Sequence, residues 1–317
     1  MANRLDLSVE LAPRNRRGLR LANPVMTASG TCGYGAELAD VMDISRLGAL
    51  VCKGTTFAPR EGNPQPRIAE TPGGMLNAIG LQNIGVQALV KEKAPAWASW
   101  QTPVIVNIAG ATVEEYVRIA EALDGVPGVS GIEVNISCPN VKEGGMEFGS
   151  HPEAAARVTT EIRKATSLPL LVKLTPNTAD IVGVARAVAG AGADALTLIN
   201  TLAGMAIDIH KRRPLLGNRT GGLSGPALKP VALRMVYAVA AAVDVPIVGC
   251  GGIATGEDAL EFLMAGASAV QVGTATFLNP HAPIDVLEGI ESFMSREKMT
   301  RLADLIGLAQ PHKEKNG

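Results

Sequence analysis

The chain has 317 residues, of which 47% are hydrophobic and only 3% aromatic, so its core must consist mainly of Val, Ile, Leu and Ala. Its formal net charge of −1 provides no basic field for a polyphosphate partner, which counts against a nucleic-acid substrate. No apolar stretch reaches the roughly 20 residues needed to span a bilayer, and residues 1–20 carry charges where a signal peptide would be apolar. We therefore expect a cytoplasmic protein that does not bind a membrane.

Short aliphatic runs alternate with Ala-rich amphipathic segments along the whole chain. Predicted strands cover residues 24–28, 49–52, 103–106, 131–134, 169–172, 195–199, 246–249 and 269–272. Predicted helices cover residues 113–123, 152–165, 179–189, 229–242, 256–265 and 284–293. Two repeats of the pattern A-G-A-(D/S)-A, at 191–195 and 265–269, predict that a glycine ends a helix before the next strand.

Eight apolar strands with helices between them indicate a parallel sheet that is covered on both faces. The number eight favours closure into a (β/α)8, or TIM, barrel, for which 317 residues is an ordinary length. No Rossmann G-x-G-x-x-G motif opens the first unit, which counts against an open, doubly wound sheet.

Three regions depart from this repeat, within what we expect to be a single domain spanning residues 1–317 with a tail at 308–317. Residues 4–22 predict a β-hairpin that closes the barrel floor, so residues 1–22 form an N-terminal hairpin segment. Residues 57–84 and 203–227, rich in Gly and Pro, are long insertions after the second and sixth strands. Loops that follow barrel strands lie on the C-terminal face, where active sites lie.

A polar residue follows each of five consecutive strands, at Lys53, Asn107, Asn135, Lys173 and Asn200. Asn and Lys are depleted in strands, and the ends of barrel strands meet at one mouth, so we interpret the five as parts of one binding site. Amides suit a planar ligand with alternating donors and acceptors, such as a pyrimidine or a flavin. A buried Lys suits an anion or a ring that gains negative charge.

Glycines follow the last two strands, within residues 248–253 (VGCGGI) and 272–277 (VGTATF). Such glycines let backbone N–H groups approach a phosphate, and barrels usually hold a phosphate at this position. Tight turns without a ligand are the alternative. The histidines lie in loops or near the tail without metal-ligand spacing, so we expect no metal site; they are His151, His210, His281 and His312.

The four cysteines are Cys32, Cys52, Cys138 and Cys250, and none belongs to a C-x-x-C pair that would suggest zinc or an iron–sulfur cluster. Three of them lie in or beside apolar runs, where buried, inert thiols are expected. Cys138 differs, because it lies in the polar segment NISCPN, three residues after Asn135. A cysteine held next to a carbon acid can act as a base, although a small buried hydrophobe is the alternative.

The order of several motifs resembles that of the dihydroorotate dehydrogenases. These motifs are ASGTCGYG, CKGTT, NAIGLQNIGV, NISCPN, LVKLTPN, INT, GGLSGPA, GCGGI and QVGTA, and the resemblance extends from about residue 4 to residue 300. The cysteine at position 138 is similar to that of the class 1, cysteine-base enzymes. NAIGLQNIGV and EVNISCPNVKEGG most resemble the catalytic subunit of the NAD-linked class 1B enzymes.

This resemblance implies an FMN-dependent oxidoreductase of pyrimidine (UMP) biosynthesis that oxidises dihydroorotate to orotate. It implies that FMN contacts Ser29, Lys53, Gly54, Asn107, Asn135, Lys173, Ile199, Gly225, Gly251, Gly252, Gly273 and Thr274. It implies that the substrate contacts Lys53, Asn77, Ala78, Ile79, Gly80, Leu81, Asn135, Asn140, Asn200 and Thr201. Cys138 is then expected to take the C5 proton of dihydroorotate while a hydride leaves C6 for the flavin.

The class 1B resemblance also implies a partner subunit with FAD and a [2Fe–2S] cluster that passes electrons to NAD. The assembly is then expected to be a homodimer or a heterotetramer. A fumarate-linked class 1A-type enzyme and a tRNA-dihydrouridine synthase, another FMN barrel, are the main alternatives. A phosphate-binding barrel without flavin and a non-enzymatic flavin-binding protein are two further ones.

Overall fold

The computed structural model describes residues 5–137, 142–143 and 146–311 and contains a parallel eight-stranded sheet. Its strands are β3 (Val25–Thr27), β4 (Leu50–Val51), β7 (Val104–Ile108), β8 (Gly131–Asn135), β11 (Leu170–Leu174), β12 (Ala195–Leu198), β17 (Ile247–Cys250) and β18 (Ala269–Val272). From β4 to β18 each strand of this sheet pairs with the next one along the chain, and β18 pairs with β3. A bridge between Met26 and Ala49 joins the two remaining edges, β3 and β4, and confirms the predicted barrel.

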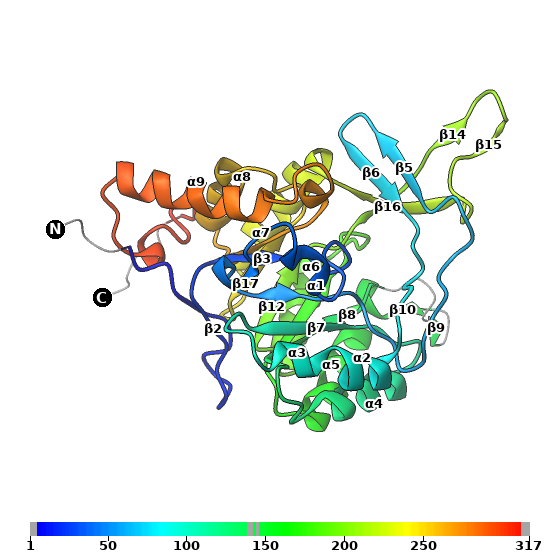
Figure 1. Ribbon diagram of the computed structural model, residues 1–317, viewed down its shortest axis with the longest axis horizontal. Coiled ribbons are helices and arrows are strands. Elements are labelled where there is room, and N and C mark those ends of the chain that lie inside the picture. Colours follow the sequence, from blue (N-terminus) through cyan, green and yellow to red (C-terminus); the bar gives the residue numbers. More distant parts are fainter. Residues whose placement is uncertain (1–4, 138–141, 144–145, 312–317) are drawn as a thin grey trace.

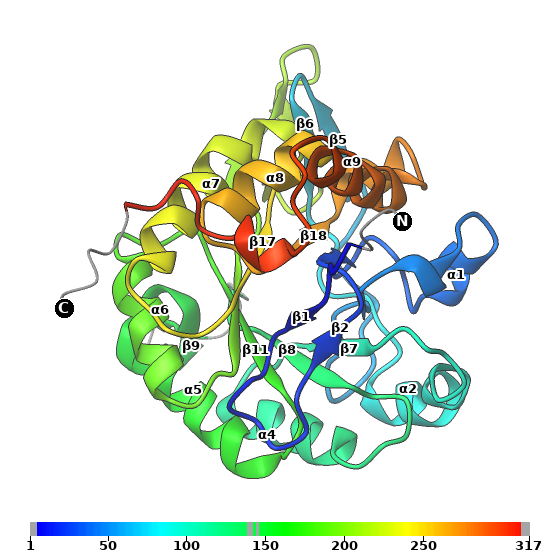
Figure 2. The same cartoon turned by 90° about the vertical axis from the view of Figure 1, so that its left-hand side faces the viewer.

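Helices surround the sheet, as Figure 2 shows in a view along the barrel. Six of them match the predicted segments: α4 (Val113–Leu123), α5 (Pro152–Ala165), α6 (Ile181–Gly190), α7 (Lys229–Ala240), α8 (Gly256–Met264) and α9 (Ala282–Arg296). Gly192 and Gly266, after α6 and α8, have φ of 103° and 110°, which confirms the predicted glycine stops.

The short helices α1 (Ala36–Ala39), α2 (Val86–Glu92) and α3 (Ala94–Trp97) were not predicted. The 3-10 turns are η1 (Ile44–Arg46), η2 (Phe148–Ser150), η3 (Pro226–Leu228), η4 (Thr274–Phe277) and η5 (Leu302–Asp304).

The N-terminal hairpin covers one end of the barrel. Strands β1 (Val9–Glu10) and β2 (Arg20–Leu21) pair antiparallel, and Figure 2 shows them across the centre of the ring of helices. Leu11, Leu19 and Leu21 of this segment are buried. Because their apolar surface closes the floor, access to the barrel interior is left to the opposite end, as predicted.

The two long insertions combine into one antiparallel sheet, which the sequence did not predict. Its order is β13-β16-β6-β5, with β5 (Ile68–Thr71), β6 (Gly74–Asn77), β13 (Leu202–Met205) and β16 (Thr220–Ser224). The pairing of β6 with β16 brings Asn77 opposite Gly222. Figure 1 shows this sheet, and the β14 (Ile207–Asp208)–β15 (Arg213–Pro214) hairpin, on the side away from the chain ends.

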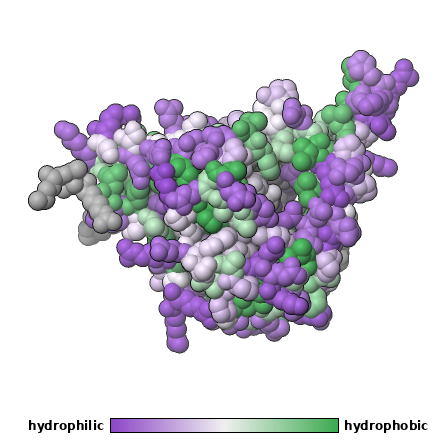
Figure 3. Space-filling model, in the orientation of Figure 1, coloured by the Kyte–Doolittle hydropathy of each residue, from purple (hydrophilic) through white to green (hydrophobic). Residues whose placement is uncertain are grey.

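The β14–β15 hairpin has an apolar base and a hydrophilic tip (Figure 3). Met205, Ile207 and Ile209 are exposed there. A further small pair, β9 (Lys142–Glu143) and β10 (Met146–Glu147), follows β8. Within the part of the chain that the structure describes, no helix is long and apolar enough to cross a bilayer.

Candidate active site

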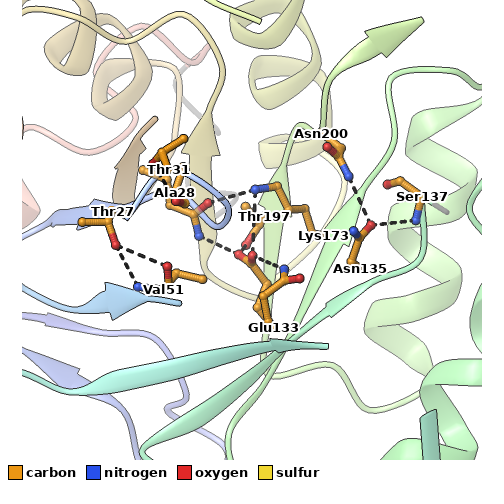
Figure 4. Close-up of polar contacts among 12 residues, drawn as sticks. Thr27, Ala28, Thr31, Val51, Glu133, Asn135, Ser137, Lys173, Thr197 and Asn200 are labelled. Carbon is orange, nitrogen blue, oxygen red and sulfur yellow. Dashed lines mark hydrogen bonds and ion pairs between the residues drawn. The ribbon is translucent and has the colours of Figure 1, made fainter. Parts of the chain in front are cut away.

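A buried carboxylate, Glu133 in the middle of β8, connects side chains from four strands inside the barrel (Figure 4). Its Oε1 accepts a hydrogen bond from Asn107 Nδ2 at 2.7 Å. Its Oε2 accepts from Thr197 Oγ1 at 2.9 Å and from Gln271 Nε2 at 2.6 Å. Strands β8, β12 and β18 are not neighbours in the sheet, so these contacts cross the barrel interior.

Lys173, at the end of β11, is the cation of this cluster. Its side chain is 6% exposed. Its Nζ donates a hydrogen bond to Gln271 Oε1 at 3.2 Å and lies 3.8 Å from Glu133 Oε1. Burial alone lowers the pKa of Lys173, but the Glu133 carboxylate and a hydrogen bond to the Cys250 sulfur outweigh it and raise the pKa above its usual value. Lys173 is therefore a buried ammonium, as an anion-stabilising residue must be.

Asn135 and Asn200 form a second polar group beside the first (Figure 4). Asn135 Oδ1 accepts from Asn200 Nδ2 at 3.1 Å and from the Ser137 backbone N–H at 3.0 Å. The Tyr116 hydroxyl donates to the Asn135 carbonyl at 2.6 Å, and Asn200 Oδ1 accepts from the Thr201 N–H. The start of the segment that leads to Cys138 is thus anchored through Asn135.

Lys53, after β4, remains apart from both groups. Its ammonium is half-buried and has no hydrogen-bond or ion-pair partner among the described residues. Next to it, a Cβ at Gly54 would lie 3.1 Å from Asn107 Oδ1 and 3.3 Å from Leu81 Cδ2. The insertion residues expected to hold substrate therefore lie against residues expected to bind FMN at this point.

Leu81 has a φ of 57°, a left-handed conformation that costs a branched residue free energy. Hydrogen bonds around it maintain this turn: Asn83 Nδ2 donates to the Leu81 carbonyl at 2.7 Å and to Thr56 Oγ1 at 2.8 Å. Of the neighbouring predicted residues, Asn77 donates to Gly222 and Ala78 is buried.

Unpaired backbone donors gather at the ends of β17 and β18. The N–H groups of Gly251, Gly252, Gly273 and Thr274 donate to no described residue. Gly252 has a φ of 80°, and a Cβ there would lie 2.6 Å from the Lys229 backbone nitrogen, so glycine is required. This arrangement of free N–H groups suits a phosphate.

The remaining predicted FMN residues surround these donors. A Cβ at Gly251 would lie 3.6 Å from Ile199 Cγ1, and one at Gly225 would lie 3.6 Å from Thr274 Cγ2. Thr274 Oγ1 donates to Ser224 Oγ at 2.8 Å. Ser29 follows Ala28, and a Cβ added at Gly273 would lie 3.0 Å from the Ala28 Cβ. The structure thus brings the predicted phosphate residues together.

Two predicted residues, Cys138 and Asn140, lie outside the described residues. The other three cysteines are buried thiols, as expected. Burial raises the pKa of Cys32 to about 12 and also raises the pKa values of Cys52 and Cys250. They are therefore neutral at physiological pH and poor candidates for a base. No group of His, Cys, Asp and Glu among the described residues could hold a metal ion.

A comparison with protein families matches residues 13–294 to the family model described as dihydroorotate dehydrogenase. The chain belongs to the dihydroorotate dehydrogenase family. Similar proteins are the "Dihydroorotate dehydrogenase B (NAD(+)), catalytic subunit" of Geotalea uraniireducens and that of Pelobacter propionicus, each 58% identical over 302 residues. These alignments cover 95% of this chain and 97% and 98% of the two relatives.

A third relative with the same name, from Geobacter metallireducens, is 56% identical over 307 residues, which are 97% of this chain and 99% of the relative. Members of this family use FMN. The described residues fit that cofactor, because free N–H groups suit its phosphate and the buried Lys173 suits its ring. Asn107 Oδ1 and Asn135 Nδ2 form no hydrogen bond with a described residue, so they add one acceptor and one donor.

Glu133 and its partners Thr197 and Gln271 were not predicted from the sequence. GIEV and the run around Gln271 have the pattern of apolar strands, in which only the residues that follow attract notice. The available signal was a charged residue two positions before Asn135, which period-two alternation places on the same face of β8.

Proposed function

We propose that this chain oxidises dihydroorotate to orotate, with FMN at the barrel mouth and Cys138 as the base. The observation that carries the proposal is the convergence of Lys173, Asn135 and Asn200 with the free N–H groups of Gly251, Gly252, Gly273 and Thr274, in a chain of this family.

The residues proposed to hold FMN are Ser29, Lys53, Gly54, Asn107, Asn135, Lys173, Ile199, Gly225, Gly251, Gly252, Gly273 and Thr274. The bound flavin would supply a two-electron acceptor. Lys173 is a buried cation at the end of β11, and it would stabilise negative charge that develops on the reduced ring. The glycine N–H groups hold the phosphate and so set the position of the whole cofactor.

Dihydroorotate carries a carboxylate, and Lys53 is an ammonium that no described group neutralises. We propose that Lys53 pairs with this carboxylate, and that amides and backbone groups hold the ring. These are Asn77, Ala78, Ile79, Gly80, Leu81, Asn135, Asn140, Asn200 and Thr201. The contact between Asn135 and Asn200 at 3.1 Å supports a common role, because it orients both amides.

Cys138 is proposed to remove the C5 proton as a thiolate, while the C6 hydride is lost to the acceptor and the C5–C6 double bond of orotate forms. What supports this is its place in the chain, directly after Ser137, whose N–H is held by Asn135 Oδ1. The three buried thiols are unsuited to the task, since their pKa values are raised.

We propose that electrons pass to NAD through a partner subunit with FAD and a [2Fe–2S] cluster, in a homodimer or heterotetramer in the cytoplasm. The name of the relatives, a catalytic subunit of an NAD(+) enzyme, supports this class 1B role over the fumarate-linked alternative. It also counts against a tRNA-dihydrouridine synthase.

Steady-state assays of the purified, FMN-loaded chain test this proposal. With an artificial electron acceptor the chain should form orotate from dihydroorotate, and with NAD alone it should form almost none until the partner subunit is added. Equal rates with fumarate alone would contradict the NAD-linked role. Absence of orotate with every acceptor would contradict the dihydroorotate activity itself.

A further inference from the structure

Glu133 contacts four polar side chains inside the barrel, yet none of them is proposed to bind substrate. We propose that Glu133 is a positioning residue that orients Asn107 and Lys173 toward the flavin and that its negative charge lowers the flavin's reduction potential. This inference rests on the proposed binding of FMN at the barrel mouth.

The hydrogen-bond directions support the orienting role. A carboxylate only accepts hydrogen bonds, so each amide that meets Glu133 must turn its NH2 group toward it. Asn107 uses Nδ2 for Glu133 Oε1, which leaves its Oδ1 directed toward Gly54. Gln271 uses Nε2 for Glu133 Oε2, which leaves its Oε1 free to accept from Lys173 Nζ at 3.2 Å. One carboxylate thus fixes two amides and, through Gln271, the ammonium.

The charges support the effect on the potential. Glu133 is fully buried, and Lys173 lies 3.8 Å away with 6% of its side chain exposed, so solvent screens the pair weakly. One other titratable group lies near this ammonium, Cys250, whose raised pKa keeps it neutral. Glu133 is therefore the only anion among the described side chains that contact Lys173, and it offsets part of that cation's field.

Reduction places negative charge on the flavin. With Glu133 replaced by a neutral residue, Lys173 would be uncompensated and would stabilise the reduced state more strongly. The reduction potential should then rise. A residue that only supports the fold would change stability without moving the potential in this direction.

The experiment compares wild type with Glu133→Gln, which keeps the size of the side chain and removes its charge. Thr197→Val is the matched control, because it removes a hydrogen bond to the same carboxylate and keeps the charge. The potential is measured by anaerobic equilibration with reference dyes, and FMN affinity by fluorescence titration of FMN-free protein.

For Glu133→Gln we expect a shift of at least tenfold in the oxidised-to-reduced equilibrium toward reduced flavin, which is about 30 mV for a two-electron couple. FMN should also bind at least tenfold more weakly. For Thr197→Val the equilibrium should shift less than about threefold, since the charge remains.

An unchanged potential in folded Glu133→Gln would overturn the inference. If that variant does not fold, Gln271→Met serves instead, because it removes only the amide that links Glu133 to Lys173 at similar volume. It should weaken FMN binding at least tenfold, and wild-type affinity would count against the orienting role. Failure of wild type to bind FMN would contradict the proposed function, a result distinct from either of these.

Discussion

Replacing Lys173 with Met should destabilise the FMN-free protein markedly, because it leaves the Glu133 carboxylate buried without its cation. Lys173 and Glu133 have side chains 6% and 0% exposed. Removing one partner of such a pair costs about 3–5 kcal/mol. Glu133 retains its hydrogen bonds from Asn107, Thr197 and Gln271, so we expect the lower end, about 3 kcal/mol.

The magnitude can be converted into a melting temperature. At about 2.1 cal/mol/K per residue, unfolding of a chain of this length has an entropy of roughly 0.7 kcal/mol/K. A loss of about 3 kcal/mol then lowers Tm by roughly 4 to 5 °C. Scanning calorimetry of FMN-free wild type and Lys173→Met measures this difference directly.

Lys229→Met is the matched control. Lys229 Nζ makes shorter contacts, 2.7 Å to Asp258 and 2.8 Å to Glu261, but its side chain is 27% exposed. Exposed ion pairs are worth about 1 kcal/mol or less, so Tm should fall by under about 2 °C. Adding Glu133→Gln to Lys173→Met should recover most of the lost stability. Equal effects of Lys173→Met and Lys229→Met would refute the reasoning that burial, rather than distance, sets the cost.

Four other predictions concern the base, the buried thiols and the phosphate site. Cys138→Ala should keep its FMN but be reduced by dihydroorotate about 10² to 10⁴ times more slowly in anaerobic stopped flow, and a wild-type rate would contradict its role as base. The native protein at pH 8 should leave Cys32, Cys52 and Cys250 unmodified by iodoacetamide, as peptide mass spectrometry would show, because burial raises their pKa values. For the same reason the free energy of unfolding should fall as the pH rises above about 9, because only the thiols of the unfolded chain ionise there. A free energy of unfolding that does not change up to about pH 11 would contradict this. Gly252→Ala should bind FMN more weakly and lose about 1–3 kcal/mol of stability in urea unfolding. The reason is that φ is 80° there and the new Cβ would clash with the Lys229 backbone nitrogen. Unchanged FMN affinity would argue against the phosphate site.

The sequence predicted most of the barrel because each strand consists mainly of aliphatic residues and each of the six longer helices has a clear amphipathic pattern. It did not predict α1, α2 and α3, which are short and follow the first two strands, where periodicity is weak. The pairing of β6 with β16 was also beyond prediction, because it joins segments about 145 residues apart through a register that only the folded barrel imposes.

The residues of the candidate site that stand at strand ends were predicted from the sequence, and those that lie within the strands were not. Lys173, Asn135 and Asn200 interrupt the pattern after an apolar run, and they do lie together. Glu133 lies within such a run, and only the closed barrel brings it to Thr197 and Gln271. The roles of Cys138 and Asn140 depend on the resemblance alone and stay predictions.

An anaerobic titration tests the central claim most directly. Dihydroorotate is added stepwise to the FMN-loaded chain, and both the visible absorbance of the flavin and the amount of orotate formed are measured. The account predicts that one equivalent of dihydroorotate bleaches one equivalent of flavin and yields one equivalent of orotate. A flavin that stays oxidised in excess dihydroorotate, while dithionite still reduces it, would contradict the account.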